Sequence, residues 1–136
     1  MNPMEPALSG VTLHLIYFAI ALVALGVFIA VYTAITPYWE IRLIRDGNTA
    51  AAISLGGAIL GYCCPLAQSV AQAGSFQDML LWSVVALVAQ LAAYGVTRLL
   101  LPHLAADINT GKIAPSIFLA ALSIGIGILN AAAMSE

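Results

Sequence analysis

The stretch RDGNTAAAISLGGAILG, residues 45–61, places a polar turn directly before a long run of apolar and small residues. The residues at 46–48 favour turns, and Asn48 or Thr49 can cap a helix that begins here. The apolar run that follows has the length of roughly 20 residues that an α-helix needs to cross a bilayer. We therefore expect a membrane-spanning helix over about 50–72, which enters the membrane from a polar turn.

Around this helix the whole chain is apolar. Of its 136 residues, 62% are hydrophobic and 7% are charged, whereas soluble domains carry about 25% charged residues. Three further apolar segments are long enough to span a membrane, at about 10–36, 78–101 and 113–134. Backbone amides cannot stay unpaired in hydrocarbon, so each segment is expected to be helical. The sequence predicts an all-α membrane protein with four transmembrane helices in one membrane domain over 1–136.

The basic residues of the chain lie only beside the first and third connections between these helices. They are Arg42 and Arg45 in the first connection, and Arg98 and Lys112 at the two ends of the third. Connections that carry Lys and Arg tend to stay on the cytoplasmic side of the membrane. We therefore expect both connections in the cytoplasm, with the middle turn at 73–77 and both termini in the periplasm.

The first connection, residues 38–48, mixes apolar and charged residues in a way that predicts a short helix at the membrane interface. The four basic residues are then expected to contact headgroups, including those of anionic lipids. The turn at 46–48 has two interpretations: it caps the next helix, or it binds an anionic group at the helix start. Four basic residues are too few for a nucleic-acid surface, so no nucleic-acid partner is expected.

The two halves of the chain match each other in sequence. When the two basic connections are aligned, Gly47 falls on Gly111, and further matches continue along the helices that follow. Each half then consists of a helix, a basic connection and a second helix, over about 10–72 and 78–134. The pattern predicts two tandem copies of a two-helix unit, which an even number of helices keeps parallel in the membrane.

Residues 45–61 also resemble the YjfL type of small bacterial inner-membrane protein, a family also called domain of unknown function number 350. The resemblance covers most of the chain. It is strongest at 37–65 and weaker at 102–130, where Lys112 stands in place of the asparagine. The resemblance implies two copies of a two-helix unit, a bacterial inner-membrane location and an envelope or membrane-stress setting. It implies no established reaction and no catalytic residues.

Small residues recur at helical spacing on one face of the second and fourth predicted helices. The residues of these two faces are Ala50, Ser54, Gly57, Gly61, Ser123 and Gly127. Small residues let helix backbones approach one another closely in lipid. We interpret the faces as helix-packing surfaces, within one chain or between subunits. The alternative is that a small solute or an ion moves along them.

Polar residues inside the predicted helices form a second candidate set. Gln68 and Gln72 lie one turn apart on the second helix, Gln90 and Tyr94 on the third, and Asn130 on the fourth. In lipid such side chains form hydrogen bonds across helices, worth about 0.6–2 kcal/mol each. We expect them to join the helices, and the alternative is a polar path through the protein.

Residues that carry out catalysis or bind metals are scarce. Cys63 and Cys64 are adjacent in an apolar helix, where we expect small hydrophobic side chains rather than a disulfide or metal ligands. His14 and His103 lie near the predicted membrane interfaces without an acidic partner on the same face. The sequence contains no nucleophile–base pattern, metal motif or phosphate loop. No ionisable residue falls near the centre of a span. We therefore expect no enzyme activity, no cofactor and no metal.

Two functions fit these observations. The first is an oligomeric scaffold or assembly subunit of the bacterial envelope, built from copies of this chain and open to a further membrane-protein partner. The second is a small oligomeric channel or transporter with a polar path near Gln68, Gln90 and Asn130. Four-helix exporters of similar length couple to protons through an acidic residue in the first helix. Residues 11–36 contain none, which argues against proton-coupled cation export.

Reporter fusions test the predicted orientation. A reporter fused after Gly47 is expected to report the cytoplasm, and one fused after Ser75 the periplasm, because the arginines hold the first connection inside. The measurement is the activity of a pair of reporters, one active only in the cytoplasm and one only in the periplasm. Arginine-bearing connections on the outer face would contradict the prediction.

Overall fold

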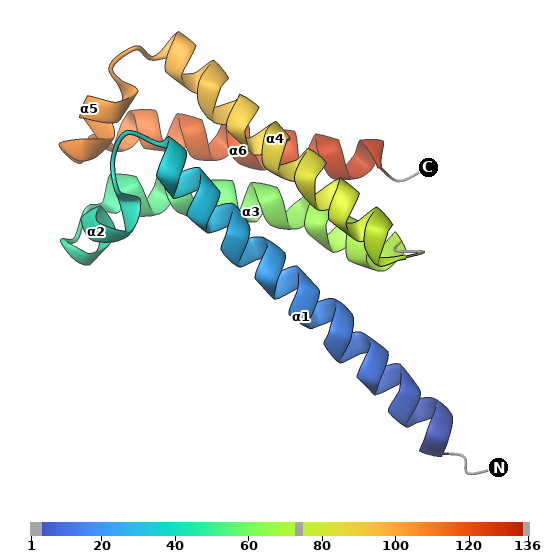
Figure 1. Ribbon diagram of the computed structural model, residues 1–136. Coiled ribbons are helices and arrows are strands. Elements are labelled where there is room, and N and C mark those ends of the chain that lie inside the picture. The colour runs from blue at the N-terminus through green and yellow to red at the C-terminus, as the bar shows by residue number, and fades with distance from the viewer. Residues whose placement is uncertain (1–3, 73–74, 135–136) are drawn as a thin grey trace.

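The computed structural model describes residues 4–72 and 75–134, and all regular structure in these residues is helical (Figure 1). In chain order the helices are α1 (Met4–Ile35), α2 (Glu40–Arg45), α3 (Thr49–Gln72), α4 (Phe76–Leu100), α5 (Leu104–Asn109) and α6 (Ile113–Ala133). The middle turn predicted at 73–77 falls partly outside the described residues, as do both chain ends. The all-α class predicted from the sequence is confirmed.

Four of the described helices, α1, α3, α4 and α6, are long and apolar enough to cross a membrane. The four predicted spans are therefore confirmed, and α3, α4 and α6 begin and end within two residues of the prediction. Helix α1 begins earlier than predicted, at Met4. Pro6 does not prevent this start, because it lies in the first turn, where a proline removes no helical hydrogen bond. It ends at Ile35, since Pro37 disfavours the helical conformation of Thr36.

The short helices α2 and α5 lie at one end of the bundle, each between two long helices (Figure 1). Helix α2 is the short helix predicted for the first connection. Helix α5 was not predicted, because six residues are too few to display a helical pattern. Both helices lead into a glycine with positive φ, Gly47 at +87° and Gly111 at +86°. A residue with a Cβ rarely adopts this conformation, so glycine is required at both turns.

The two turns also share their backbone hydrogen bonds. In each turn the glycine N–H donates to the carbonyl three residues earlier, and the next N–H donates to the carbonyl five residues earlier. The donor–acceptor distances are 3.0 and 2.9 Å in the first turn, and 3.1 and 2.8 Å in the second. This pair of bonds satisfies carbonyl groups that the end of a helix leaves open. The α2–α3 and α5–α6 connections are thus built alike.

Helices α3 and α6 start at the same end of the bundle and run side by side in the same direction (Figure 1). Helix α4 packs on both of them, whereas α1 packs mainly on α3 and its N-terminal part leads away from the bundle (Figure 1). In the most apolar stretch of each helix, 56% of the residues are buried in α3 but only 11% in α1. The core is therefore the α3–α6 pair with α4, and α1 is peripheral.

The backbones of α3 and α6 touch along a seam made by Gly57, Gly61, Ala120, Ser123 and Gly127. A Cβ atom on Gly61 would overlap the carbonyl oxygen of Ser123, and one on Gly127 would overlap the carbonyl oxygen of Gly61. A Cβ on Gly57 would likewise overlap Ala120. In lipid, helices associate through such close packing rather than through the hydrophobic effect. The seam therefore depends on glycine at three positions.

Alanine substitutions test this dependence. Gly61→Ala is expected to lower the free energy of unfolding by about 1–3 kcal/mol, because the new methyl group meets a backbone carbonyl that cannot move aside. Gly125→Ala is the matched control, since Gly125 occupies the aligned position on α6 and a Cβ there meets nothing within 4 Å among the described residues. The control should be neutral or slightly stabilising. Reversible unfolding in mixed detergent micelles measures both, and equal losses would contradict the prediction.

Candidate functional site

All six residues of the predicted small-residue faces are buried inside this single chain, either in the seam or just before it. They are Ala50, Ser54, Gly57, Gly61, Ser123 and Gly127. The sequence left open whether these faces join helices of one chain or of two. In the structure they join α3 to α6 of the same chain. The faces are therefore occupied before any second subunit is considered.

Gln90 of α4 reaches the seam at the point where the two helices are closest. Its side chain is 0% exposed, and its Nε2 donates to the carbonyl oxygen of Ser123 over 3.1 Å. The same Nε2 lies 2.7 Å from where a Cβ on Gly61 would be. Gln90 thus ties α4 to the seam and fills the space that the missing side chain leaves.

Three polar atoms in this region are buried without a hydrogen-bond partner among the described residues: Gln90 Oε1, Ser123 Oγ and Asn130 Nδ2. The two glutamines on α3 are less buried than these residues, because Gln68 is half-buried and Gln72 is exposed. The residues predicted to form a polar path therefore differ in how far they are buried. Tyr94 lies near α2.

Asn48 connects the two turns at the α2 and α5 end. Its Oδ1 accepts from the backbone N–H of Ala51 over 3.0 Å and so caps α3. Its Nδ2 donates to the carbonyl oxygen of Ile108 over 2.8 Å and lies 3.4 Å from that of Asn109. The capping role of Asn48 was predicted, but its bond to the second half of the chain was not. One side chain thus starts a helix and joins the two connections.

The four basic residues are all exposed at this same end of the bundle. They are Arg42, Arg45, Arg98 and Lys112. Lys112 Nζ lies 3.4 Å from Asp107 Oδ1, an ion pair that solvent screens because the lysine side chain is 69% exposed. Between the two turns is a polar groove of about 500 Å³, lined by residues that include Asp46 and Thr110. This end therefore offers exposed positive charge beside a polar groove.

A buried carboxyl group lies beside this charged end, and the sequence analysis missed it. Glu40, the first residue of α2, is 0% exposed. Its Oε1 lies 2.7 Å from Thr36 Oγ1, within hydrogen-bonding distance, whereas its Oε2 has no partner among the described residues. A signal was present, because Tyr32, Thr36 and Glu40 follow one another at intervals of four residues. In a continuous helix that spacing would place them on one face, and the three stay on one side here although α1 ends at Ile35 and α2 begins at Glu40.

Three tyrosines surround this carboxyl group, and together with Thr36 and Glu40 they form what we call the Glu40 corner. Tyr32 of α1, Tyr38 of the connection and Tyr94 of α4 interact electrostatically with Glu40. The rings of Tyr32 and Tyr94 meet edge to face, with centroids 5.9 Å apart. In the described part of the chain, none of the three buried hydroxyl groups has a hydrogen-bond partner. Burial raises the pKa of Glu40 and that of Tyr38.

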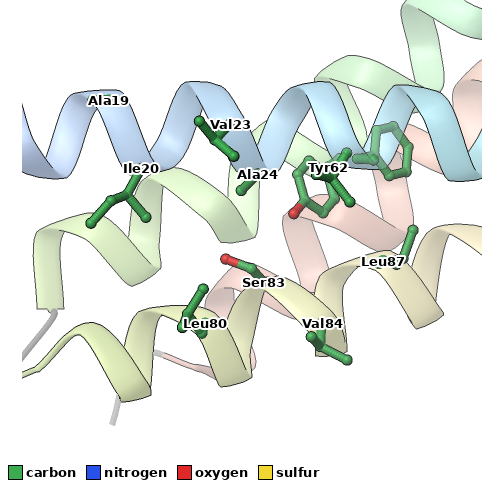
Figure 2. A pocket seen from close by; sticks show the side chains of 11 residues that line it. Ala19, Ile20, Val23, Ala24, Tyr62, Leu80, Ser83, Val84 and Leu87 are labelled. Atoms are coloured by element: carbon green, nitrogen blue, oxygen red, sulfur yellow. The ribbon is translucent and has the colours of Figure 1, made fainter.

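Two apolar grooves flank α1 where it leaves the bundle. Figure 2 shows the first, about 390 Å³ in volume, which is lined by Ile20 and Val23 of α1 and by Leu80 and Val84 of α4, with Tyr62 of α3 further along the groove. The second, also about 390 Å³, lies between α1 and α3 and includes His14 and Cys63 in its lining. Both grooves have few polar groups in their linings, so both suit an acyl chain or an apolar helix.

The histidines and cysteines take no part in a cluster that would bind a metal. Cys63 and Cys64 are free and half-buried. His14 stacks on Phe18 with ring centroids 6.1 Å apart, and His103 is exposed before α5. Among the described residues, no group of three or more His, Cys, Asp or Glu side chains is placed to hold a metal ion.

Four apolar spans and two short helices at one end define this chain as a small multi-pass membrane protein. It belongs to the family described as Domain of Unknown Function (DUF350), whose model matches residues 6–134. The chain is 36% identical over 119 residues to the UPF0719 inner membrane protein YjfL of Escherichia coli strain K12, covering 88% of this chain and 90% of the relative. The family resemblance inferred from residues 45–61 is therefore confirmed.

A second relative comes from a Gram-positive bacterium. The chain is 30% identical over 118 residues to the UPF0719 transmembrane protein YshE of Bacillus subtilis strain 168, covering 85% of this chain and 88% of the relative. No solved structure matches the chain. The names of these relatives give a membrane location and no activity.

Substitution of Asn48 tests whether it joins the two connections. Asn48→Asp keeps the oxygen that caps α3 but replaces the donor to Ile108 with a carboxylate that faces carbonyl oxygens. We expect it to lower the free energy of unfolding by about 1–3 kcal/mol, the cost of an unpaired buried polar group. Asn109→Asp is the control, because it adds the same charge at an exposed position of the same end. Unfolding in detergent measures both, and a neutral Asn48→Asp would show that only the cap matters.

Proposed function

We propose that this chain is a non-enzymatic inner-membrane protein that acts as a homo-oligomeric scaffold or assembly subunit, in bacterial envelope or membrane-stress physiology. The observation that carries the proposal is the state of α1, which leaves the bundle and presents an unoccupied small-residue face to the membrane. The envelope setting rests on the family alone. No cofactor is part of the proposal.

The free face of α1 consists of Gly26, Ala30 and Ala34, which recur every four residues and are all exposed. A Cβ on Gly26 would meet nothing within 4 Å among the described residues. Small residues at this spacing allow two membrane helices to approach closely. The corresponding faces of α3 and α6 are used inside the chain, so α1 is the helix left to contact another copy.

The grooves beside α1 support the same conclusion. They lie between α1 and the core helices on both sides, and their linings are almost entirely apolar (Figure 2). A helix of a second copy that docks on the small-residue face can fill such a groove with its larger side chains. A second copy is favoured over an unrelated partner because the same surface on two copies gives a closed two-fold interface.

The proposal includes two tandem two-helix units, about 10–72 and 78–134, in parallel orientation. The matching turns at Gly47 and Gly111, the short helix before each turn and the common direction of α3 and α6 support this arrangement. Two copies related in this way offer a simple origin for the seam, in which equivalent helices of the two units pack on each other.

The proposal also places the α2 and α5 end in the cytoplasm and both termini in the periplasm. The exposure of all four basic residues at this one end supports it, because positive charge is retained on the cytoplasmic side. The cytoplasmic leaflet carries anionic lipids, and each nearby Lys or Arg contributes about 1 kcal/mol to their attraction. Anionic lipid is accordingly the partner we propose for Arg42, Arg45, Arg98 and Lys112.

A channel or transporter is the second candidate, favoured by the unpartnered polar atoms of Gln90, Ser123 and Asn130. The closed seam argues against a path through one chain, because the backbones of α3 and α6 touch beside Gln90 and leave no space for a solute. The amide of Gln90 is also held by the Ser123 carbonyl. A path would have to form between chains, which keeps transport second to scaffolding.

Two glycine variants test the proposed assembly. The wild-type protein in mild detergent is expected to have one discrete oligomeric mass. Gly26→Leu should shift that mass to the monomer, because the larger side chain blocks the α1 face without touching its own chain. Gly95→Leu is the control, since Gly95 is also exposed with open space around it but lies on α4. A monomeric wild type, or an unchanged mass for Gly26→Leu, would contradict the proposal. The measurement is native mass spectrometry.

Flux assays separate scaffolding from transport. Liposomes that contain the wild-type protein are expected to be no more permeable to ions and small solutes than protein-free liposomes. Reproducible flux that is lost in Gln68→Leu or Gln90→Leu would reverse the ranking and make the channel the first candidate.

A further inference from the structure

In the Glu40 corner, the hydroxyl oxygen of Thr36 lies near three other oxygen atoms, but the hydroxyl group has only one hydrogen to donate. Thr36 Oγ1 lies 2.7 Å from Glu40 Oε1, 3.1 Å from the carbonyl oxygen of Tyr38 and 3.3 Å from that of Thr33. A threonine hydroxyl group carries one hydrogen and can donate it once. If Glu40 is ionised, this hydrogen serves the carboxylate, and the contacts with both carbonyl oxygens are left without one.

A proton on Glu40 supplies the missing hydrogen. The acid O–H then donates to Thr36 Oγ1 across the 2.7 Å contact, which is an ordinary length for an O–H···O hydrogen bond. The Thr36 hydroxyl group becomes free to donate to the carbonyl oxygen of Tyr38 over 3.1 Å. The geometry therefore fits a neutral carboxylic acid better than a carboxylate.

The surroundings of Glu40 provide no opposite charge. In the described residues the one ion pair joins Asp107 and Lys112, and none reaches Glu40. The neighbours of Glu40 from α1 and from the connection are the uncharged side chains of Tyr32 and Tyr38. An ionised carboxyl group that is buried without a partner costs several kcal/mol, and such groups usually take up a proton instead.

The other helices packed against this corner also lack a compensating cation. Helix α4 contributes Tyr94, and Arg98 on the same helix interacts with Tyr94 and has an exposed side chain. Helix α3, which packs on α2, has no charged residue from Thr49 to Gln72. On α2 itself, Arg42 and Arg45 are exposed.

We propose that the Glu40 corner is a proton-binding site, in which Glu40 is a neutral acid in contact with Thr36, and that release of the proton loosens the packing around Glu40. The proton is transferred from the carboxyl group to water, and the carboxylate that remains must then be solvated. The hydroxyl groups of Tyr32, Tyr38 and Tyr94 are buried donors without partners in the described structure. They can bind the carboxylate only if the corner rearranges or admits water.

The direction of the pH dependence follows from burial. Burial raises the pKa of Glu40 above its ordinary value, although Thr36 and the residue's own backbone N–H oppose the shift. The unfolded chain releases the proton near the ordinary value, whereas the folded chain retains it. Stability is therefore full at pH values below the ordinary pKa and is lost as the pH rises through the raised one.

A metal ion is a poorer fit to this corner than a proton. Glu40 is its one carboxyl group, and the other oxygens come from uncharged hydroxyl and carbonyl groups. Hard cations in proteins take six or more oxygen ligands, with several carboxylates for a divalent ion. A proton needs neither additional ligands nor space, so it is the ligand that we assign.

Infrared difference spectroscopy on the full chain in lipid tests the site. The wild type is expected to show, at neutral pH, the C=O stretch of a protonated carboxyl group that shifts on exchange into D2O. Glu40→Gln should lack this band and remain folded, because an amide has nearly the shape of the neutral acid. Asp78→Asn is the control and should retain the band, since Asp78 is exposed at the opposite end of the bundle.

Unfolding measured across pH tests the coupling to stability. Between the ordinary and the raised pKa of Glu40, the unfolding equilibrium constant of the wild type should rise by up to about tenfold per pH unit, as expected for one proton. The same constant in Glu40→Gln should show no such rise. A folded wild type without the band at neutral pH, or a band that persists in Glu40→Gln, would overturn the proposal. Loss of the band on adding Na⁺ or K⁺ at constant pH would also overturn it, in favour of a cation site.

Discussion

The direct contact between the backbones of α3 and α6 is the constraint on which the other parts of this protein depend. Water is absent from the bilayer interior, so helices there gain little from burying apolar side chains and must instead approach closely. Gly61 and Gly127 permit that approach, because each occupies space that any Cβ would block. Gln90 then holds α4 against the same point through the Ser123 carbonyl. The core is consequently a closed three-helix unit with polar atoms sealed inside it.

The closed core decides what the remaining elements can do. Because α3 and α6 use their small-residue faces on each other, the small-residue face left exposed at Gly26 is that of α1, which is the surface we propose for assembly. Because the two helices start side by side, their turns meet, and Asn48 can bond across to Ile108. The same packing brings α2 against α3, and Glu40 is buried. The exposed face of α1 and the buried carboxyl group of Glu40 thus both follow from how the helices of this chain pack.

Much of the fold could be predicted from the sequence, and the failures have physical causes. The four spans were predicted because length and hydropathy alone determine which segments enter lipid. The turn at Gly47 and the helix cap at Asn48 could be predicted, because a turn and a cap each depend on neighbouring residues in the sequence. Helix α5 was missed because it is held by its neighbours rather than by its own pattern. Glu40 was interpreted as one of several loop charges, because burial of a charged residue depends on elements distant in the sequence.

The sequence by itself determined that the chain lies in a membrane, where three of its four long helices begin and end, and which family it belongs to. These properties depend on composition and on neighbouring residues, which a linear pattern records. Only the tertiary structure decided that the small-residue faces join α3 to α6 within one chain, that Asn48 links the two connections, and that Glu40 is buried near three tyrosines. The reason is that these contacts depend on which helices become neighbours, and in lipid that choice is made by the fit of whole surfaces.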